Sequence, residues 1–230
     1  MAMRSAALFF VLLLAACSAP LTAPPASPTA TLAPTVTPIP TFTPVPPTPT
    51  TSIPILEVPI PELGTVAYDF IAHVCEAQWT NNGQTLLCPG YLQQITPGYI
   101  GVIERPQVEG ELRVQATALL TVPAQGGGYY GIFGKYPPLT VQAGDRFRAV
   151  LACWHNYPCE AEYALEYIDA NGAYQPFASW NHRYGGGPVF VYLDLSPLAN
   201  QTVNFVLVVR DNGNPSNDFA LWIIPYIYRP

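Results

Sequence analysis

The chain has 230 residues, of which 50% are hydrophobic and 10% are charged, and its formal net charge is −6. Nine Lys and Arg residues against 15 Asp and Glu leave no basic surface to neutralise phosphates, which argues against a nucleic-acid partner. The 14 Tyr and 10 Phe residues favour β-strands, because aromatic side chains pack well on a pleated surface. We therefore expect a secreted, all-β domain.

The N-terminus combines one positive charge with a short apolar run. Arg4 precedes the apolar residues 6–16. About a dozen residues are too few to cross the roughly 30 Å hydrocarbon core of a bilayer as a helix. The pattern predicts a signal peptide over residues 1–16 and not a transmembrane helix.

The end of this run, Leu14-Ala15-Ala16-Cys17, resembles the lipobox of bacterial lipoproteins. The resemblance implies that Cys17 becomes the acylated first residue of the mature chain, carrying acyl chains such as palmitate. Two acyl chains hold a protein firmly, so the lipid bilayer is an expected partner. The expected location is the extracytoplasmic face of the cell membrane, with plain secretion as the alternative.

Residues 17–62 are dominated by Pro, Thr, Ala and Ser. Proline removes backbone donors and pushes its neighbours towards extended geometry, and nothing in this stretch repeats at a helical or strand period. We expect a disordered linker that holds a domain away from the membrane. A role as a proline-motif ligand is the alternative.

Residues 63–230 are expected to form one domain that starts with a short helix and continues as strands. Asp69–Ala77 has an N-cap residue and an apolar face. Glu111–Val122 alternates apolar and polar residues, which predicts a half-buried strand. Further short strands are predicted at Tyr99–Glu104, Tyr129–Phe133, Arg146–Cys153, Glu160–Ile168, Tyr174–Trp180, Val189–Leu195, Thr202–Arg210 and Phe219–Tyr228. Pro225 places the last strand at an edge or at a bulge.

Two of these strands are expected to form a hairpin closed by cysteines. Setting Cys153 opposite Cys159 puts Leu151, Ala149 and Phe147 opposite Ala161, Tyr163 and Leu165 on one apolar face. The same register places Arg146 opposite Glu166 on the other face. Directly opposed residues lie at a separation that a disulfide can bridge.

Lipidation of Cys17 leaves four cysteines, an even number in an oxidising compartment. The local pairs Cys75–Cys88 and Cys153–Cys159 are the expected disulfides. The alternative, one zinc ion bound by four thiolates, is disfavoured because neither pair has a Cys-x-x-Cys spacing.

No catalytic motif is present, and no cofactor motif either. Glu160, Glu162 and Glu166 could suggest a glycosidase, but their spacing places them on one outer strand face beside arginines, which favours solvated salt bridges. We expect a protein that is not an enzyme and that has no cofactor.

The loop from Trp154 to Pro158 is the most suggestive surface, because a disulfide would hold two aromatic rings, an imidazole and an amide at its tip. Sugar-binding sites need flat apolar rings with a few polar groups, and rigid loops lower the entropy cost of binding. The alternative is that Trp154 folds back to cap the core. The candidate ligand-binding residues are Trp154, His155, Tyr157, Trp79, Tyr129 and Tyr184.

The segment from Asp211 to Asp218 is rich in oxygen-bearing side chains. Asp211, Asn214 and Asp218 are candidate calcium ligands, since calcium prefers carboxylate, amide and carbonyl oxygens. The segment lacks a fixed calcium-loop pattern, and an ordinary Asx-rich turn is the favoured interpretation.

The C-terminal third, from Val191-Tyr192-Leu193-Asp194-Leu195-Ser196 to Asp218-Phe219-Ala220-Leu221-Trp222, resembles the closing strands of galactose-binding-like jelly rolls. Asn200 replaces a glycine of that pattern. The resemblance implies an antiparallel two-sheet jelly-roll β-sandwich and, by analogy, a module that binds glycan or cell-wall carbohydrate. The alternative function is an envelope or adhesion module that binds a protein and has no sugar site.

Overall fold

The computed structural model describes residues 53–58, 64–125, 131–213 and 215–230. The chain divides into two units, residues 1–49 and 50–230, and every described residue belongs to the second unit. The expected signal peptide, Cys17, nearly all of the linker, Tyr129 and Asn214 lie outside the described residues. None of the helices found in the described ranges has the length and apolar character needed to cross a bilayer.

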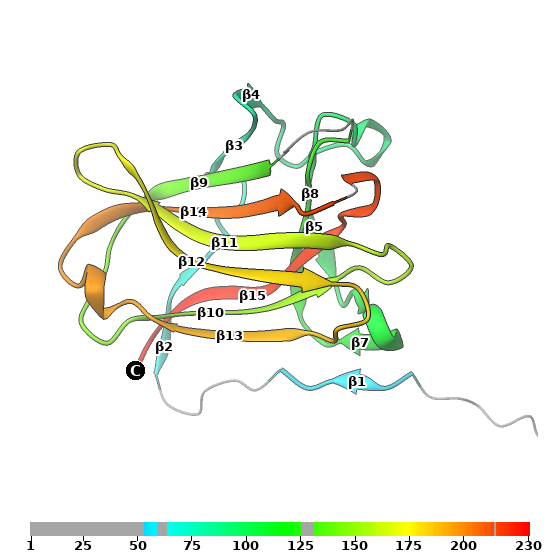
Figure 1. The fold of residues 1–230 in the computed structure, drawn as a ribbon. Helices are drawn as coiled ribbons and strands as arrows, with labels where there is room; N and C mark the ends of the chain where they lie inside the picture. The colour runs from blue at the N-terminus through cyan, green and yellow to red at the C-terminus, as the bar shows by residue number, and fades with distance from the viewer. Residues whose placement is uncertain (1–52, 59–63, 126–130, 214) are drawn as a thin grey trace, which may run out of the picture. The chain divides into compact units, whose positions relative to one another are not determined.

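Residues 64–230 build a two-layer β-sandwich (Figure 1). One layer, sheet I, has the order β13 (Val189–Asp194), β10 (Arg146–Cys153), β15 (Ala220–Arg229), β8 (Thr117–Val122) and β5 (Tyr99–Glu104), and β2 (Thr65–Asp69) pairs with the second half of β15. The other layer, sheet II, has the order β12 (Tyr174–Arg183), β11 (Glu160–Ile168), β14 (Thr202–Asp211), β9 (Gly131–Thr140), β3 (Gln78–Asn81) and β4 (Gln84–Thr85). All pairs within both sheets are antiparallel, so the predicted fold class is confirmed.

A small sheet III and four 3₁₀ turns complete the described elements. Sheet III contains β1 (Ile55–Leu56), β7 (Leu112–Val114) and β6 (Gln107–Val108). The turns are η1 (Leu92–Gln94), η2 (Glu109–Glu111), η3 (Ser196–Leu198) and η4 (Pro215–Asn217). β1 runs parallel to β7 and lies inside the range expected for the linker, so ordered pairing begins before residue 63.

The main core fills the space between sheets I and II with aromatic residues. Trp79, Phe147, Tyr163 and Trp222 are each at most 1% exposed. Tyr163 and Trp222 meet edge to face at 5.1 Å, the geometry that aromatic pairs prefer. A second apolar cluster lies on the opposite side of sheet I, where Val108 and Val114 of sheet III cover part of that sheet.

The predicted helix at Asp69–Ala77 does not form. Asp69 ends β2, and its carboxylate accepts hydrogen bonds from the amides of Ile71 and Ala72, as an N-cap would. The chain then makes consecutive turns, and the Val74 carbonyl accepts a hydrogen bond from the indole of Trp79 at 2.7 Å. A helix of nine residues is not stable without support from packing. Here the indole of the buried Trp79 binds a carbonyl that a helix would use for its own hydrogen bonds.

Three predicted strands, Tyr99–Glu104, Arg146–Cys153 and Glu160–Ile168, have the predicted bounds. The strand predicted at Glu111–Val122 is wrong in two respects. It breaks into β7 and β8, because the chain passes from sheet III to sheet I at this point. β8 is buried on both faces, since Leu120 packs in the second cluster while Leu119 packs in the main core.

The predicted hairpin is also wrong, although its disulfide is confirmed. β10 pairs with β13 and β15, whereas β11 pairs with β12 and β14 in the other sheet. The Cys153–Cys159 disulfide, with a Cα separation of 5.7 Å, therefore joins the two layers. The apolar faces of both strands do meet, but across the core. Arg146 consequently lies opposite Asp194 and Tyr228, and not opposite Glu166.

Pro225 lies at a bulge, which is one of its two predicted positions. The register between β10 and β15 shifts between Arg148 and Val150, next to Pro225, and Ile224 has a positive φ of 42°. β15 pairs with β8 before this point and with β2 after it. The bulge therefore lets one central strand change its neighbour. The Cys75–Cys88 disulfide is confirmed as well, with a Cα separation of 5.2 Å.

Candidate functional site

The loop from Trp154 to Pro158 connects sheet I to sheet II and is held at both ends. The Cys153–Cys159 disulfide closes it. The Trp154 amide donates to the Phe219 carbonyl at 2.9 Å, and the His155 amide donates to the Gln107 carbonyl at 3.0 Å. These bonds fix the backbone of the loop, so its side chains are positioned before any ligand arrives.

Two of the loop's aromatic side chains pack as a stack beside a surface hollow. The Trp154 and Tyr157 rings lie 5.4 Å apart, and the Tyr157 ring stacks on Phe219 at 3.9 Å. The hollow, of about 370 Å³, is lined by Leu92, Ile95, Gln125, Trp154, Tyr157, Ser216, Asn217 and Phe219. We call this set of residues the aromatic hollow. Trp154 and Tyr157 are half-buried, so they support one another and still present surface to the hollow.

The other predicted ligand-binding residues do not join this site. Trp79 is 1% exposed in the main core, so its prediction as a ligand contact is corrected: it is a packing residue. His155 and Tyr184 are half-buried and do not line the hollow. Tyr129 lies outside the described residues. Sequence reasoning missed Phe219, Gln125, Leu92 of η1 and Ile95, which follows η1, because they come from segments that only the fold brings to the loop.

Two of the three predicted calcium ligands lie close together. The Asp218 carboxylate accepts a hydrogen bond from the Glu160 amide at 2.8 Å, and its second oxygen is buried without a hydrogen-bond partner among the described residues. Burial raises the pKa of Asp218 to about 7, and the nearby carboxylates of Asp211 and Glu160 act in the same direction. Asn214, the third candidate, lies outside the described residues.

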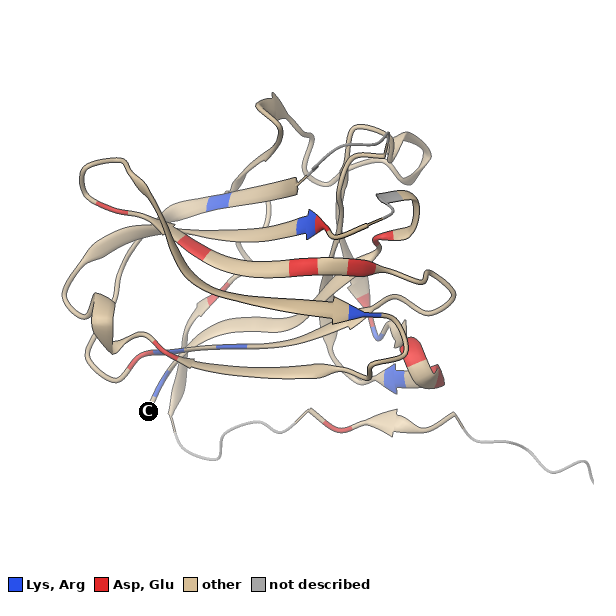
Figure 2. Cartoon of the chain, viewed as in Figure 1, with Lys and Arg blue, Asp and Glu red and all other residues tan. Residues whose placement is uncertain are grey.

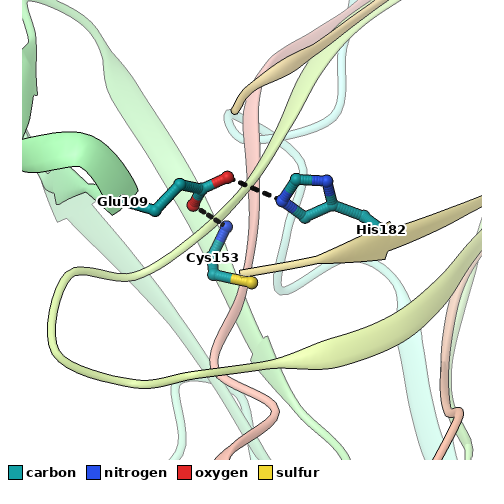
Figure 3. Close-up of side chains that lie close together, drawn as sticks. All are labelled: Glu109, Cys153 and His182. Carbon is teal, nitrogen blue, oxygen red and sulfur yellow. Dashed lines mark hydrogen bonds and ion pairs between the residues drawn. The ribbon is translucent and has the colours of Figure 1, made fainter. Parts of the chain in front are cut away.

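A second cluster of titratable groups lies in the interior, where Glu109 of η2 reaches His182 of β12 (Figure 3). The Glu109 Oε1 to His182 Nε2 distance is 2.7 Å, and the side chains are 1% and 3% exposed. The other carboxylate oxygen accepts the amide hydrogen of Cys153.

Within the described ranges, Glu109, Cys153 and His182 form the one group of three possible metal ligands whose atoms lie within 4.8 Å. Cys153 is bonded to Cys159, so its sulfur is not a thiolate and does not suit a metal. The cluster does not fit a metal centre, and it instead links η2 and sheet I to sheet II.

The three glutamates of β11 lie on the outer face of sheet II, as predicted. Figure 2 shows acidic residues along β11 beside a basic residue of β14. Arg210 of β14 contacts Glu162 at 3.5 Å and makes a shorter ion pair with Glu166, while Glu160 faces Arg183 at 3.8 Å. The salt-bridge interpretation is therefore confirmed, with partners different from those the hairpin implied. A glycosidase would need two carboxylates facing one bond, whereas Glu162 and Glu166 are both paired with Arg210.

Comparisons with known proteins return similar folds at low identity. No family model and no curated protein matches the sequence. A xylan-binding domain of carbohydrate-binding module family 22 is 16% identical, with 74% of this chain and 96% of that chain covered and a TM-score of 0.40. A family 11 carbohydrate-binding module of a cellulosomal cellulase of Clostridium thermocellum is 8% identical, with 72% and 94% covered and a TM-score of 0.37.

The glycoside hydrolase domain of Endo-D from Streptococcus pneumoniae is 11% identical, with 58% of this chain and 22% of that chain covered and a TM-score of 0.37. Each of these TM-scores is below 0.5. The fold described above therefore rests on the strand pairing of this chain, and the site rests on its own side chains.

Proposed function

We propose that residues 64–230 bind a glycan in the aromatic hollow and that the chain displays this domain on the outer side of a membrane through acylated Cys17. The observation that carries the proposal is the stack of Trp154, Tyr157 and Phe219 beside a hollow with amide groups in its lining. Flat rings pack against the apolar faces of sugars, and a few amide and carbonyl groups orient the hydroxyls.

The loop is also rigid in the way that such a site requires. A disulfide and three backbone hydrogen bonds, made by the amides of Trp154, His155 and Tyr157, hold it. A preformed site loses less conformational entropy on binding. Gln125 donates to the Ser216 carbonyl at 3.2 Å, which fixes one polar wall of the hollow.

The test is a glycan array probed with the full chain, followed by titration of the best glycan. Tyr157→Ala should weaken binding at least about 30-fold, because removing a central aromatic anchor commonly costs 2 kcal/mol or more. Tyr174→Ala is the matched control, since Tyr174 is 59% exposed on β12 and does not line the hollow. Equal binding by the two variants would refute the site.

The competing function is a module that binds a protein and no sugar. Crosslinking in cells that captures one protein reproducibly, together with no retention on any glycan, would replace the glycan proposal. Anchoring is tested separately, because Cys17→Ala should release the chain from the membrane fraction. Unchanged membrane retention would refute lipidation.

A further inference from the structure

Arg148 is a buried cation on the outer face of sheet I. It lies on β10 directly opposite Tyr192 of β13 and Tyr226 of β15, and it is 9% exposed. Side chains that are directly opposed across paired strands project to the same face of a sheet. The guanidinium is therefore surrounded by tyrosine rings on a face that points away from the core.

Arg148 differs from Arg210 and Arg229 in having no anionic partner among the described residues. Arg210 has two carboxylates, and Arg229 makes two hydrogen bonds to Asp145. Across the described ranges, the Arg148 guanidinium has no hydrogen bond and no ion pair. Burial also disfavours its charged form and so lowers the pKa of Arg148. A buried charge without a partner is costly, so a residue of this kind calls for an explanation.

Two acidic residues share this face in the strand register, Asp194 and Asp69, and each already accepts hydrogen bonds from its own loop. Glu57 lines a hollow beside Tyr226, and within the described ranges it makes no ion pair with Arg148. Asp194, opposite Arg146, accepts hydrogen bonds from the amide and hydroxyl of Ser196. Asp69, opposite Tyr226, caps the turn that follows β2. Neither carboxylate reaches Arg148 at ion-pair distance, so its charge stays available.

The edge of this face formed by β13 carries exposed aromatic side chains. Phe190 and Tyr192 on the edge strand β13 are 52% and 57% exposed. The Arg146 guanidinium lies 5.2 Å from the centre of the Tyr192 ring. Figure 2 shows the basic residues of β10 beside β13 on this layer. We define the Arg148 face as Arg146, Arg148, Phe190, Tyr192 and Tyr226.

We propose that the Arg148 face binds the carboxylate of an acidic saccharide, a polymer of uronic acid residues, at a site distinct from the aromatic hollow. A guanidinium matches a carboxylate with two parallel hydrogen bonds, and exposed rings pack against the apolar faces of sugar rings. Phe190 and Tyr192 at the β13 edge of the face are exposed, so an extended chain can approach Arg148 from that edge. No cationic side chain lines the aromatic hollow, so the two sites select different saccharides.

An anionic bilayer is the other surface that could bring negative charge to these arginines. Two arginines in a chain of net charge −6 provide little attraction to such a membrane, because polybasic clusters of about four or more are typical there. A saccharide needs only one well-placed guanidinium with aromatic support. The charge and the size of the face therefore favour the saccharide.

The test measures binding of the full chain to polygalacturonic acid and to the same polymer with its carboxylates fully methyl-esterified. The acid form should bind, and the ester should bind at least about tenfold more weakly, because a hydrogen bond between two charged groups is lost. Arg148→Gln should reduce binding of the acid form by about tenfold or more. Tyr192→Ala should reduce it by a smaller factor.

Arg113→Gln is the matched control, because it removes the same charge from an exposed position on β7 away from this face. It should bind polygalacturonic acid like the unaltered chain. Absence of binding to the acid form, equal binding of the acid and ester forms, or equal effects of Arg148→Gln and Arg113→Gln would each overturn the proposal. Binding to phosphatidylglycerol vesicles without binding to the polyuronate would overturn it in favour of a membrane contact.

A readout of folding keeps this test separate from misfolding and from the glycan proposal. Arg148→Gln should keep the thermal midpoint of the unaltered chain, and it should keep the affinity of the aromatic hollow for its uncharged glycan. Tyr157→Ala should have the reverse pattern, with polyuronate binding intact. Loss of both activities in Arg148→Gln, or loss of the fold, would refute an independent site.

Discussion

The outer faces of sheets I and II differ in whether the arginine on them has a carboxylate partner. On sheet II, Arg210 is 30% exposed and contacts the carboxylates of Glu162 and Glu166, which are 31% and 14% exposed. On sheet I, Arg148 is 9% exposed and is surrounded by tyrosines with no carboxylate at ion-pair distance in the described residues. The better-solvated cation is the compensated one.

This difference separates Arg210, whose charge stabilises the fold, from Arg148, whose charge is available to a ligand. Arg210 of β14 makes ion pairs with both Glu162 and Glu166 of β11, so its charge is compensated within the domain. Arg148 carries a desolvation cost that no carboxylate of the described residues offsets. Removing Arg210 should therefore lower the stability of the domain, whereas removing Arg148 should not. Loss of the interior Glu109–His182 pair should have the largest effect of all.

The largest expected loss comes from Glu109→Ala. This change leaves His182 buried without its partner and removes the acceptor of the Cys153 amide. Breaking a buried pair costs about 3–5 kcal/mol, so the urea unfolding midpoint should fall sharply. Glu104→Ala, at an exposed position on β5, is the control. Similar midpoints for the two variants would mean that the interior pair contributes nothing.

The next effect depends on pH and concerns Asp218. Because the pKa of Asp218 in the folded state, about 7, is above the ordinary value of 3.8 for aspartic acid, the folded state holds a proton that the unfolded state releases between these values. The free energy of unfolding should then fall as pH rises from about 4 to about 7. Asp218→Asn should flatten this part of the curve measured by urea titration. A curve of unchanged slope in the variant would contradict the assignment.

Arg210→Gln should produce a smaller loss, of about 1 kcal/mol, because the ion pairs are partly solvated. Glu162 and Glu166 are then left facing each other without the cation, so the loss should shrink as salt is added. Thermal unfolding at low and high salt measures it. A loss that does not depend on salt would point to packing of the arginine stem instead.

The smallest effect expected is that of Arg148→Gln. Removing an uncompensated buried cation should leave the thermal midpoint unchanged or raise it, since no partner is abandoned. The measurement is the same thermal unfolding series. A clear loss of stability would show that Arg148 has a structural role that its surroundings do not reveal.

Much of the fold could be predicted because alternation and turn residues are local signals. Three strand ranges and the two disulfides follow from the order of residues along the chain, and the bulge at Pro225 is one of the two positions that the order allows. The pairing partners of β10 and β11 could not be predicted in this way. The same apolar alternation suits two strands that pair side by side and two strands that face each other across a core.

The site was predictable only in its loop. Trp154 and Tyr157 are recognisable because a short disulfide-closed segment concentrates their rings. Phe219 and Gln125 are distant from this loop in the sequence. Phe219 directly precedes β15 and Gln125 follows β8, and the pairing of these strands brings both residues to the hollow. Trp79 was misassigned because composition cannot distinguish a ring that fills a core from one that meets a ligand.

The sequence by itself determines that this chain carries a lipobox-like N-terminus, a Pro/Thr-rich stretch and an all-β domain with two local disulfides. Each of these depends on neighbouring residues. The strand pairing is what makes Cys153–Cys159 join two sheets, gives Arg210 two carboxylate partners and leaves Arg148 with none among the described residues. Whether an arginine finds a carboxylate partner depends on which strands lie next to its own. That strand order is set by contacts between residues far apart in the sequence.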